Sequence, residues 1–195
     1  MTERFEKSPT PNSFLKDLAV IEERAEAHDS NVERVSMNEG AALQVLPTDT
    51  QEKILLTRSL NGCTCLVIVG EHEDGTREAL MTHYPQVYFE DNRDKLHELS
   101  EATRIALAKQ KHATAFVVGE MKGGKLQPAS ILTAGMLPAL VASELGADTT
   151  LQVIPYAEST LAESREGNGS LVVRIPPAGS GNPNYKAWFT SGDLV

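Results

Sequence analysis

The sequence predicts an α+β fold in which a mixed, largely antiparallel β-sheet, or a β-sandwich, is layered against helices. Three observations lead to this class. Apolar runs with strand character outnumber helical segments, many of these runs follow one another directly along the chain, and the helical segments are few but long. A chain of 195 residues suits one domain, which can bury roughly 70% of its unfolded surface.

The first element is expected after a flexible arm. Residues 1–12 contain Ser8-Pro9-Thr10-Pro11-Asn12, which is too polar and too rich in proline to pack. The single domain is therefore expected to span 13–195, with Ser13 as the N-cap of an amphipathic helix that ends near residues 28–30. The apolar residues at helical spacing are Phe14, Leu15, Leu18, Ile21 and Ala25.

Most of the remaining elements are predicted strands. The strongest are residues 63–70 and 77–84, which form the expected centre of the sheet and are joined by a loop in which Asp74-Gly75 is a hairpin signal. Further strands are predicted at 32–37, 41–46, 53–60, 113–119, 151–155, 170–176 and 185–190. The other predicted segments are helices at 91–111 and 130–146 and an irregular loop at 176–184.

Charge and composition exclude several classes of function. The formal net charge of -9 argues against a nucleic-acid partner, because phosphate binding relies on clustered lysine and arginine. No apolar stretch approaches the roughly 20 residues of a membrane helix, so no membrane partner is expected. Cys63 and Cys65 are the only cysteines and cannot form a disulfide framework, which favours a reducing compartment. The polar N-terminus lacks a secretory signal pattern, so we expect a cytoplasmic protein or one secreted by a non-classical route.

Two short segments can place a thiol beside an imidazole. Cys63 begins one predicted central strand and His83 ends the next, so antiparallel pairing brings them to the same end of the sheet. Whether they share a face depends on register. Cys63 and His83 lie on the same face of the sheet if the sequence numbers of two residues paired across the strands add up to an even number. A two-residue turn at Asp74-Gly75 gives an odd sum and places them on opposite faces.

A cysteine and a histidine in this arrangement can attack a carbonyl carbon. The thiolate is the nucleophile, and an adjacent imidazolium would stabilise it, because a free thiol with a pKa of about 8.5 is only slightly ionised at neutral pH. Gly62 would let the backbone approach a substrate closely and leave the amide of Cys63 free as an oxyanion donor. The groups available to orient the ring of His83 are Thr57, Thr82 and main-chain carbonyls.

The turn Leu60-Asn61-Gly62-Cys63 resembles the Leu-Ser-Gly-Cys turn of the cysteine-dependent glutamine deamidases, with Asn61 in place of the serine. This superfamily includes the chemotaxis receptor deamidase CheD, the catalytic domain of cytotoxic necrotizing factor and the Burkholderia lethal factor. Thr57 lies six residues before the cysteine and His83 ends the following strand, as in the family pattern. The order of the later helix, strand and helix is also similar, so the resemblance covers residues 53–155.

The resemblance implies a CheD-like fold and a protein-glutamine deamidase that uses no cofactor and no metal. Cys63 would attack the side-chain carboxamide of a glutamine in a protein substrate, and His83 would give a proton to the departing ammonia. Thr57 would support the imidazole, and Asn61 and Gly62 would form the turn beside the oxyanion. Water would hydrolyse the thioester to glutamate, an activity typical of toxins and effectors; an amine in place of water would give transglutamination.

Two structural interpretations of the same residues stand beside this one. A cysteine that heads an apolar strand is usually a small buried hydrophobe, and Asn61-Gly62 is also a common hairpin turn. Alternatively, Cys63, Cys65 and His83 are soft ligands for a metal ion. The sequence offers no fourth ligand near them, so a metal is not expected.

A second function class is a non-catalytic protein-binding module on the same fold. Such a module would recruit its partner through loops expected at 120–128 and 176–184. The glycine-rich residues 119–125 lack the phosphate-binding signature of a nucleotide site and are expected to form a mobile loop. Opposite faces for Cys63 and His83 would favour this alternative over catalysis.

Overall fold

The computed structural model describes residues 11–60, 63–84, 101, 104–105, 112–122, 125–126, 152–157, 169–177 and 186–190. The elements within these ranges are α1 (Pro11–Glu26), β1 (Val32–Val35), β2 (Glu39–Val45), β3 (Lys53–Thr57), β4 (Thr64–Glu71), β5 (Arg77–Tyr84), β6 (His112–Lys122), β7 (Lys125–Leu126), β8 (Gln152–Ala157), β9 (Ser170–Ile175) and β10 (Lys186–Thr190).

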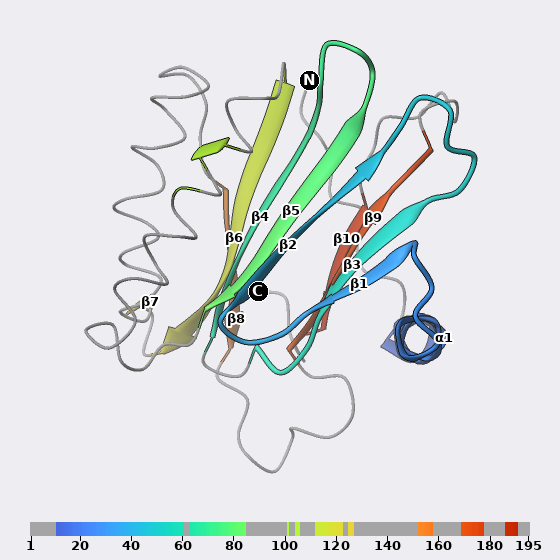
Figure 1. Ribbon diagram of the computed structural model, residues 1–195. Coiled ribbons are helices and arrows are strands. Elements are labelled where there is room, and N and C mark those ends of the chain that lie inside the picture. The colour runs from blue at the N-terminus through green and yellow to red at the C-terminus, as the bar shows by residue number, and fades with distance from the viewer. Residues whose placement is uncertain are drawn as a thin grey trace.

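These strands form two sheets that pack face to face as a β-sandwich (Figure 1). Sheet A has the strand order β1-β3-β9-β10. Sheet B has the order β2-β5-β4-β6-β7, with β8 beside β6. Within the described ranges, only the pairs β1–β3 and β6–β8 are parallel, and the other neighbours are antiparallel. The predicted α+β class, with a largely antiparallel sandwich layered against helix, is confirmed.

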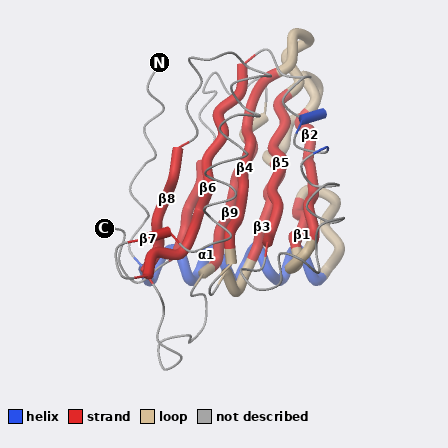
Figure 2. The backbone as a smooth tube through the Cα atoms, turned by 90° about the vertical axis from the view of Figure 1, so that its left-hand side faces the viewer, coloured by secondary structure: helices blue, strands red, loops and turns tan. Residues whose placement is uncertain are grey.

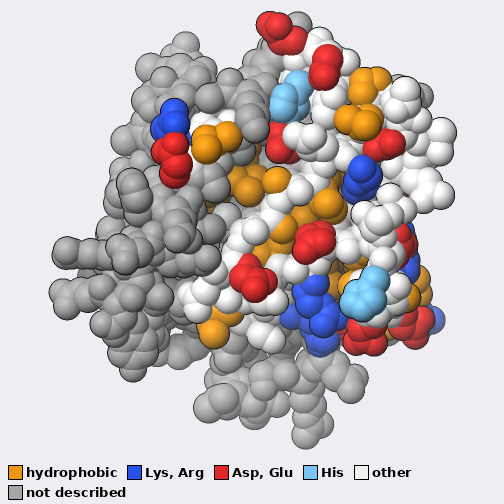
Figure 3. Space-filling model, in the orientation of Figure 1, with side chains coloured by type: hydrophobic (Ala, Val, Ile, Leu, Met, Phe, Trp, Pro, Cys, Tyr) orange, Lys and Arg blue, Asp and Glu red, His pale blue; other side chains and the backbone are white. Residues whose placement is uncertain are grey.

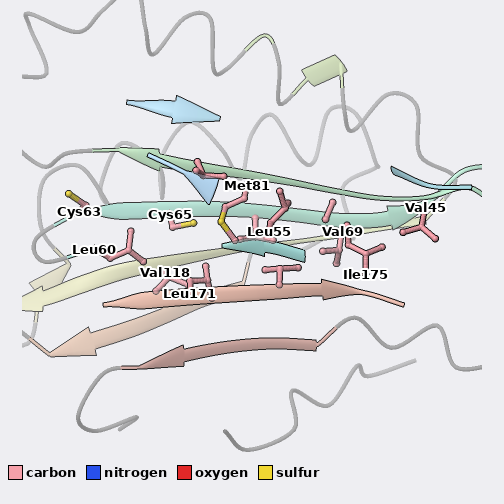
Figure 4. Packing of buried hydrophobic residues seen from close by; sticks show 14 residues of the cluster. Val45, Leu55, Leu60, Cys63, Cys65, Val69, Met81, Val118, Leu171 and Ile175 are labelled. Carbon is pink, nitrogen blue, oxygen red and sulfur yellow. The ribbon is translucent and has the colours of Figure 1, made fainter. Parts of the chain in front are cut away.

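The core lies between the two sheets. Because side chains alternate along a strand, every second residue enters this space, and Leu55 of β3, Val67 of β4 and Val173 of β9 are fully buried there. Figure 4 shows that the cluster extends along the sandwich from Cys63 at one end to Val45 at the other. Cys63 lies at the end of this core, and this position limits the groups that its thiol can contact.

Helix α1 covers the outer face of sheet A, and Figure 2 shows it crossing the strands. Its contact with the sheet is an apolar cluster of Leu18, Ile21, Val32, Ile54, Leu56 and Val172. The helix begins at Pro11 and not at the expected Ser13. Proline is tolerated in the first turn of a helix because the N–H that it lacks would have no intrahelical partner there.

The β4–β5 hairpin has an even register, which decides between the two registers that the sequence left open. Gly75 donates its amide to the carbonyl of His72 (3.1 Å), and the amide of His72 donates to the carbonyl of Thr76 (2.8 Å). Gly75 adopts a left-handed φ of 84°, typical of a three-residue hairpin loop that ends in glycine. The additional loop residue places Cys65 opposite His83, so the numbers of facing residues add to an even total.

Other predicted segments differ from the structure or lie outside the described residues. The mobile loop expected at 119–125 is wrong in part, because β6 continues to Lys122 and pairs with β7. Of the predicted helix at 91–111, only residues 101, 104 and 105 are described, and they are helical. The predicted helix at 130–146 lies outside the described part. Among the described residues, no helix is long and apolar enough to cross a membrane.

Candidate active site

Three strand ends bring the predicted site residues to one end of the sandwich. Strand β3 of sheet A ends at Thr57, and the chain then crosses to sheet B through residues 58–63. Cys63 immediately precedes β4, and β5 returns antiparallel so that His83 lies beside the start of β4. Residues from both sheets therefore meet where the inter-sheet core ends.

The side chains of Thr57 and His83 are joined by a hydrogen bond across the sandwich. Thr57 Oγ1 lies 2.8 Å from His83 Nδ1, and both residues are buried. The same hydroxyl donates to the carbonyl of Val35, the last residue of β1, at 2.7 Å. Because a hydroxyl has one proton, Nδ1 must carry the hydrogen that it shares with Thr57. The contact thus selects the tautomer of His83 in which Nε2 holds the lone pair.

The geometry selects among the three groups that the sequence offered to orient the ring. Thr57 contacts the imidazole directly. Thr82 instead donates to the carbonyl of Leu66 at 3.5 Å, and because it is adjacent to His83 in a strand, its side chain lies on the opposite face. A main-chain carbonyl acts only indirectly on the ring, because the carbonyl of Val35 accepts the hydroxyl proton of Thr57.

Burial controls the protonation of His83. Desolvation lowers the pKa of this imidazole to about 4, because the charged form loses its hydration without gaining an opposite charge. Within the described part of the chain, Nε2 is buried and has no hydrogen-bond partner. The imidazole of His83 is therefore neutral at pH 7.

The even register places Cys65 directly opposite His83. Cys63 comes one residue before the first paired residue of β4 and belongs to the same buried inter-sheet cluster as Cys65. No hydrogen bond joins Cys63 to His83 Nε2 in this structure, since Nε2 has no such partner among the described groups.

The two thiols differ in their surroundings. Cys65 is fully buried, and desolvation raises the pKa of its thiol far above the ordinary range. Cys63 retains 7% of its exposure and lies at the end of the core cluster, beside Leu60 in Figure 4. Neither cysteine is part of a disulfide. Cys63 is therefore the better placed of the two to meet a substrate.

The turn that carries Cys63 is anchored on both sides. The amide of Leu60 donates to the carbonyl of Gly169 (3.0 Å), and the side chain of Leu60 is fully buried in the core. The amide of Cys63 donates to the carbonyl of Leu60 (2.7 Å). The expectation that this amide is free as an oxyanion donor is therefore wrong. The other two predicted turn residues, Asn61 and Gly62, lie outside the described residues.

Sequence reasoning did not find the backbone groups that fix this site. Val35 accepts the hydroxyl proton of Thr57, and the amide of Asn38 donates to the carbonyl of His83 at 2.9 Å. Both come from the ends of β1 and β2, far from the cysteine turn in sequence. The only local signal is Asn38 itself, because asparagine is among the residues that tolerate the left-handed φ of 67° found there.

The described residues contain no group of three or more His, Cys, Asp or Glu side chains arranged to hold a metal ion. His72 lies at the opposite end of the β4–β5 hairpin, where its Nε2 is 2.7 Å from Glu78 Oε2. This pair belongs to the hairpin and not to the candidate site. The described side chains at the site are a thiol, a neutral imidazole and a supporting hydroxyl.

Comparisons with known proteins add no relative. No model of a known protein family matches the chain, and a search of the curated proteins finds no match.

Proposed function

We propose that this chain is a cysteine-dependent deamidase that converts a glutamine side chain of a protein substrate to glutamate. Cys63 is the nucleophile, His83 is the acid and base, and Thr57 orients the imidazole. The observation that carries the proposal is the hydrogen bond of 2.8 Å between Thr57 and His83. That bond leaves Nε2 as the nitrogen available to act as a base, at the end of the sandwich where Cys63 also lies.

The first half of the reaction forms a thioester. Because the pKa of His83 is lowered to about 4, its imidazole is neutral at pH 7 and can accept a proton. Nε2 takes the proton of Cys63 as sulfur forms a bond with the carboxamide carbon. The imidazolium then gives this proton to the amide nitrogen, the C–N bond breaks, and ammonia leaves.

The second half regenerates the enzyme. Water enters, Nε2 takes one of its protons, and the hydroxide oxygen forms a bond with the thioester carbon. The C–S bond breaks, the sulfur regains its proton from the imidazolium, and the product is glutamate. An amine in place of water would give transglutamination by the same route. No cofactor or metal takes part in either half.

Thr57 holds the ring through both halves. It accepts the Nδ1 hydrogen while its own proton is occupied by the carbonyl of Val35, so Nε2 remains the reactive nitrogen. A neutral hydroxyl stabilises the imidazolium less than a carboxylate would, which is consistent with the lowered pKa of His83. Such a thiol reaction suits the cytoplasm or another reducing compartment reached by non-classical secretion, where an effector would meet its target.

The second candidate is a non-catalytic protein-binding module. It is favoured by two features of this conformation: His83 Nε2 makes no hydrogen bond among the described groups, and the amide of Cys63 is engaged by Leu60. A module of this kind would retain the Thr57–His83 bond only as a link between the two sheets. It would bind the same protein partners without changing their mass.

Mass spectrometry of candidate substrate proteins separates the two. A deamidase adds about one dalton at a glutamine and releases ammonia in equal amount, because an amide becomes an acid. The variant Cys63→Ala should abolish both signals, whereas the matched variant Cys65→Ala should retain them. Equal activity of the wild type and Cys63→Ala would overturn the proposal.

A further inference from the structure

Strand β2 forms one edge of sheet B. It pairs with β5 along its whole length, from Glu39 opposite His83 to Val45 opposite Arg77, and it is the first strand in the sheet order. Among the residues that the structure describes, no strand pairs with its other side. An unpaired edge is a template for the backbone of another chain.

The outward backbone groups of β2 can be assigned from two hydrogen bonds. The carbonyl of Gln44 accepts a bond from Lys53 Nζ at 2.5 Å and so points away from β5. The carbonyl of His83 accepts the amide of Asn38, so odd-numbered residues of β5 point their backbone groups toward β2. Because the direction alternates along a strand, Ala41 and Leu43 pair with β5, and the outward residues are Gly40, Ala42 and Gln44.

Among the described residues, none gives this edge the usual protection against a partner strand along residues 40–43. Edges are normally blocked by charged side chains, proline, a bulge or a covering segment, yet residues 40–43 are Gly-Ala-Ala-Leu. Gly40 and Ala42 are exposed and too small to shield the backbone. Figure 3 shows uncharged surface running diagonally across the described part of this face, where β2 lies in Figure 1. Lys53 covers only the end at Gln44.

The unprotected edge leads directly to the candidate active site. Glu39 begins β2 opposite His83, and the preceding residue, Asn38, bonds to the His83 carbonyl. A chain that followed the edge toward Glu39 would leave it beside the ends of β5 and β4. Cys63 immediately precedes β4, two strands inward from β2.

We propose that the β2 edge binds an extended, uncharged segment of the protein substrate as an added strand. This inference rests on the proposed deamidase function and assigns its substrate class: a glutamine that follows or precedes a β-competent segment. Three strand spacings of about 4.8 Å separate the added strand from β4, or roughly 14 Å. At about 3.3 Å per residue, the target glutamine lies roughly four residues beyond the docked strand.

Amide hydrogen exchange on the full chain tests the docking independently of catalysis. The probes are two peptides with a Thr-Val-Thr-Val-Thr core and one glutamine about four residues before or after it, added to the Cys63→Ala variant so that no turnover occurs. We expect at least tenfold slower exchange at Gly40, Ala42 and Gln44, with no change at Ala41 and Leu43, which already bond to β5. Unchanged exchange at all five amides with either peptide, at saturating concentration, would overturn the inference.

A variant pair tests the outward amide itself. Ala42→Pro removes one outward N–H without removing a β2–β5 bond, whereas Ala42→Val retains that N–H. We expect Ala42→Pro to weaken peptide binding at least tenfold and Ala42→Val to leave it within twofold. If Ala42→Pro does not fold, the exchange experiment decides alone.

The outcomes also separate the two proposals. Protection of the outward amides without any ammonia release from the Cys63-containing chain would refute the deamidase and leave the edge as a binding surface. Ammonia release from protein substrates without protection at β2 would refute the docking alone. Protection that appears without peptide and rises with protein concentration would mean that a second copy of this chain occupies the edge, which also overturns the inference.

Discussion

His83 is a buried base whose two ring nitrogens have different tasks. Nδ1 is held by Thr57, whose own proton is donated to Val35, and Nε2 is buried with no hydrogen-bond partner among the described groups. Desolvation lowers the pKa of the ring to about 4, so it can accept a proton only when a nearby group gives one up during reaction. The site therefore suits general-base activation of the Cys63 thiol.

Replacing Thr57 tests this orientation. Thr57→Val removes the acceptor of the Nδ1 hydrogen at nearly constant volume, which frees the ring to rotate or change tautomer. We expect the rate of ammonia release to fall about 100-fold and unfolding stability to fall by about 1–3 kcal/mol. Thr57→Ser should recover most of the rate, because it restores the hydroxyl. A Thr57→Val chain with wild-type turnover would show that Thr57 only links the sheets.

The pH dependence of stability tests the buried imidazole. Between pH 6.5, the ordinary pKa, and about 4, the unfolded chain binds a proton at His83 that the folded chain excludes. Stability must therefore fall as pH falls through this window, by roughly 3 kcal/mol in total, and must not fall further from this group below pH 4. Urea titrations at several pH values should show this loss in the wild type.

The matched control for that titration is His83→Gln, which carries no titrating ring. Its stability should be nearly flat between pH 6.5 and 4. Asp29, Asp49 and Asp74 also have lowered pKa values, chiefly because backbone amides hydrogen-bond to their carboxylates, but they lose stability only below their ordinary pKa of 3.8. Parallel curves for the wild type and His83→Gln above pH 4 would refute the lowered pKa of His83.

Among the structural elements, the β4–β5 hairpin decides whether the site exists. Its loop has one residue more than a strict Asp74-Gly75 turn, and this residue places Cys65 opposite His83, next to the turn that carries Cys63. The left-handed φ of Gly75 closes the loop, and a methyl group added there would meet only Pro47 at 3.8 Å. The requirement at this position is therefore conformational and not steric crowding.

Substitutions at Gly75 test that requirement. Gly75→Ala should destabilise the fold by about 1–2 kcal/mol, because a Cβ atom disfavours the left-handed conformation. Gly75→Asn should cost less, since asparagine tolerates this region. Chemical denaturation measures both. Cys63 labelling should stay unchanged in both variants, because the buried faces of β4 and β5 hold the register; equal stability of all three chains would refute the role of the glycine.

The elements could be predicted where apolar patterning is strong, as in residues 63–70, because burial on both faces leaves a nearly continuous apolar run. The sequence also predicted Cys63, His83 and Thr57 as site residues; the structure shows the contact between Thr57 and His83, and the catalytic roles stay predictions. Register could not, because one loop residue changes it without changing composition. The role of Val35 could not either, since a main-chain carbonyl has no sequence signature and reaches Thr57 only through the parallel pairing of β1 with β3.

On the scale of the whole molecule, side chains link the two sheets at both ends of the sandwich. Thr57 and His83 do so at the candidate site. At the opposite end, Arg77 of sheet B donates to the carbonyls of Pro176 (3.2 Å) and Pro177 (2.8 Å), which follow β9 of sheet A. The apolar core fills the space between these two links.

Arg77→Met tests the distal link without touching the site. Arg77 is buried, and its charged hydrogen bonds to two carbonyls should contribute about 2 kcal/mol, which the apolar methionine cannot supply. Urea unfolding should show that loss. The reactivity of Cys63 should remain at its wild-type value, because the substitution lies at the far end of the core. A change in the reactivity of Cys63 that parallels the loss of stability would mean that the site depends on the stability of the whole fold.

The rate of Cys63 alkylation by iodoacetamide tests whether His83 activates the Cys63 thiol, because it reports this activation without a known substrate. The rate is measured by mass spectrometry of peptides containing Cys63 or Cys65, from the wild type, His83→Gln and Thr57→Val, between pH 5 and 8. We predict that wild-type Cys63 reacts well below the ordinary thiol pKa, at least tenfold faster than Cys65. We also predict that both variants slow it to the level of an unassisted thiol. Equal, slow labelling of both cysteines in the wild type, or labelling unaffected by His83→Gln, would show that His83 does not activate Cys63.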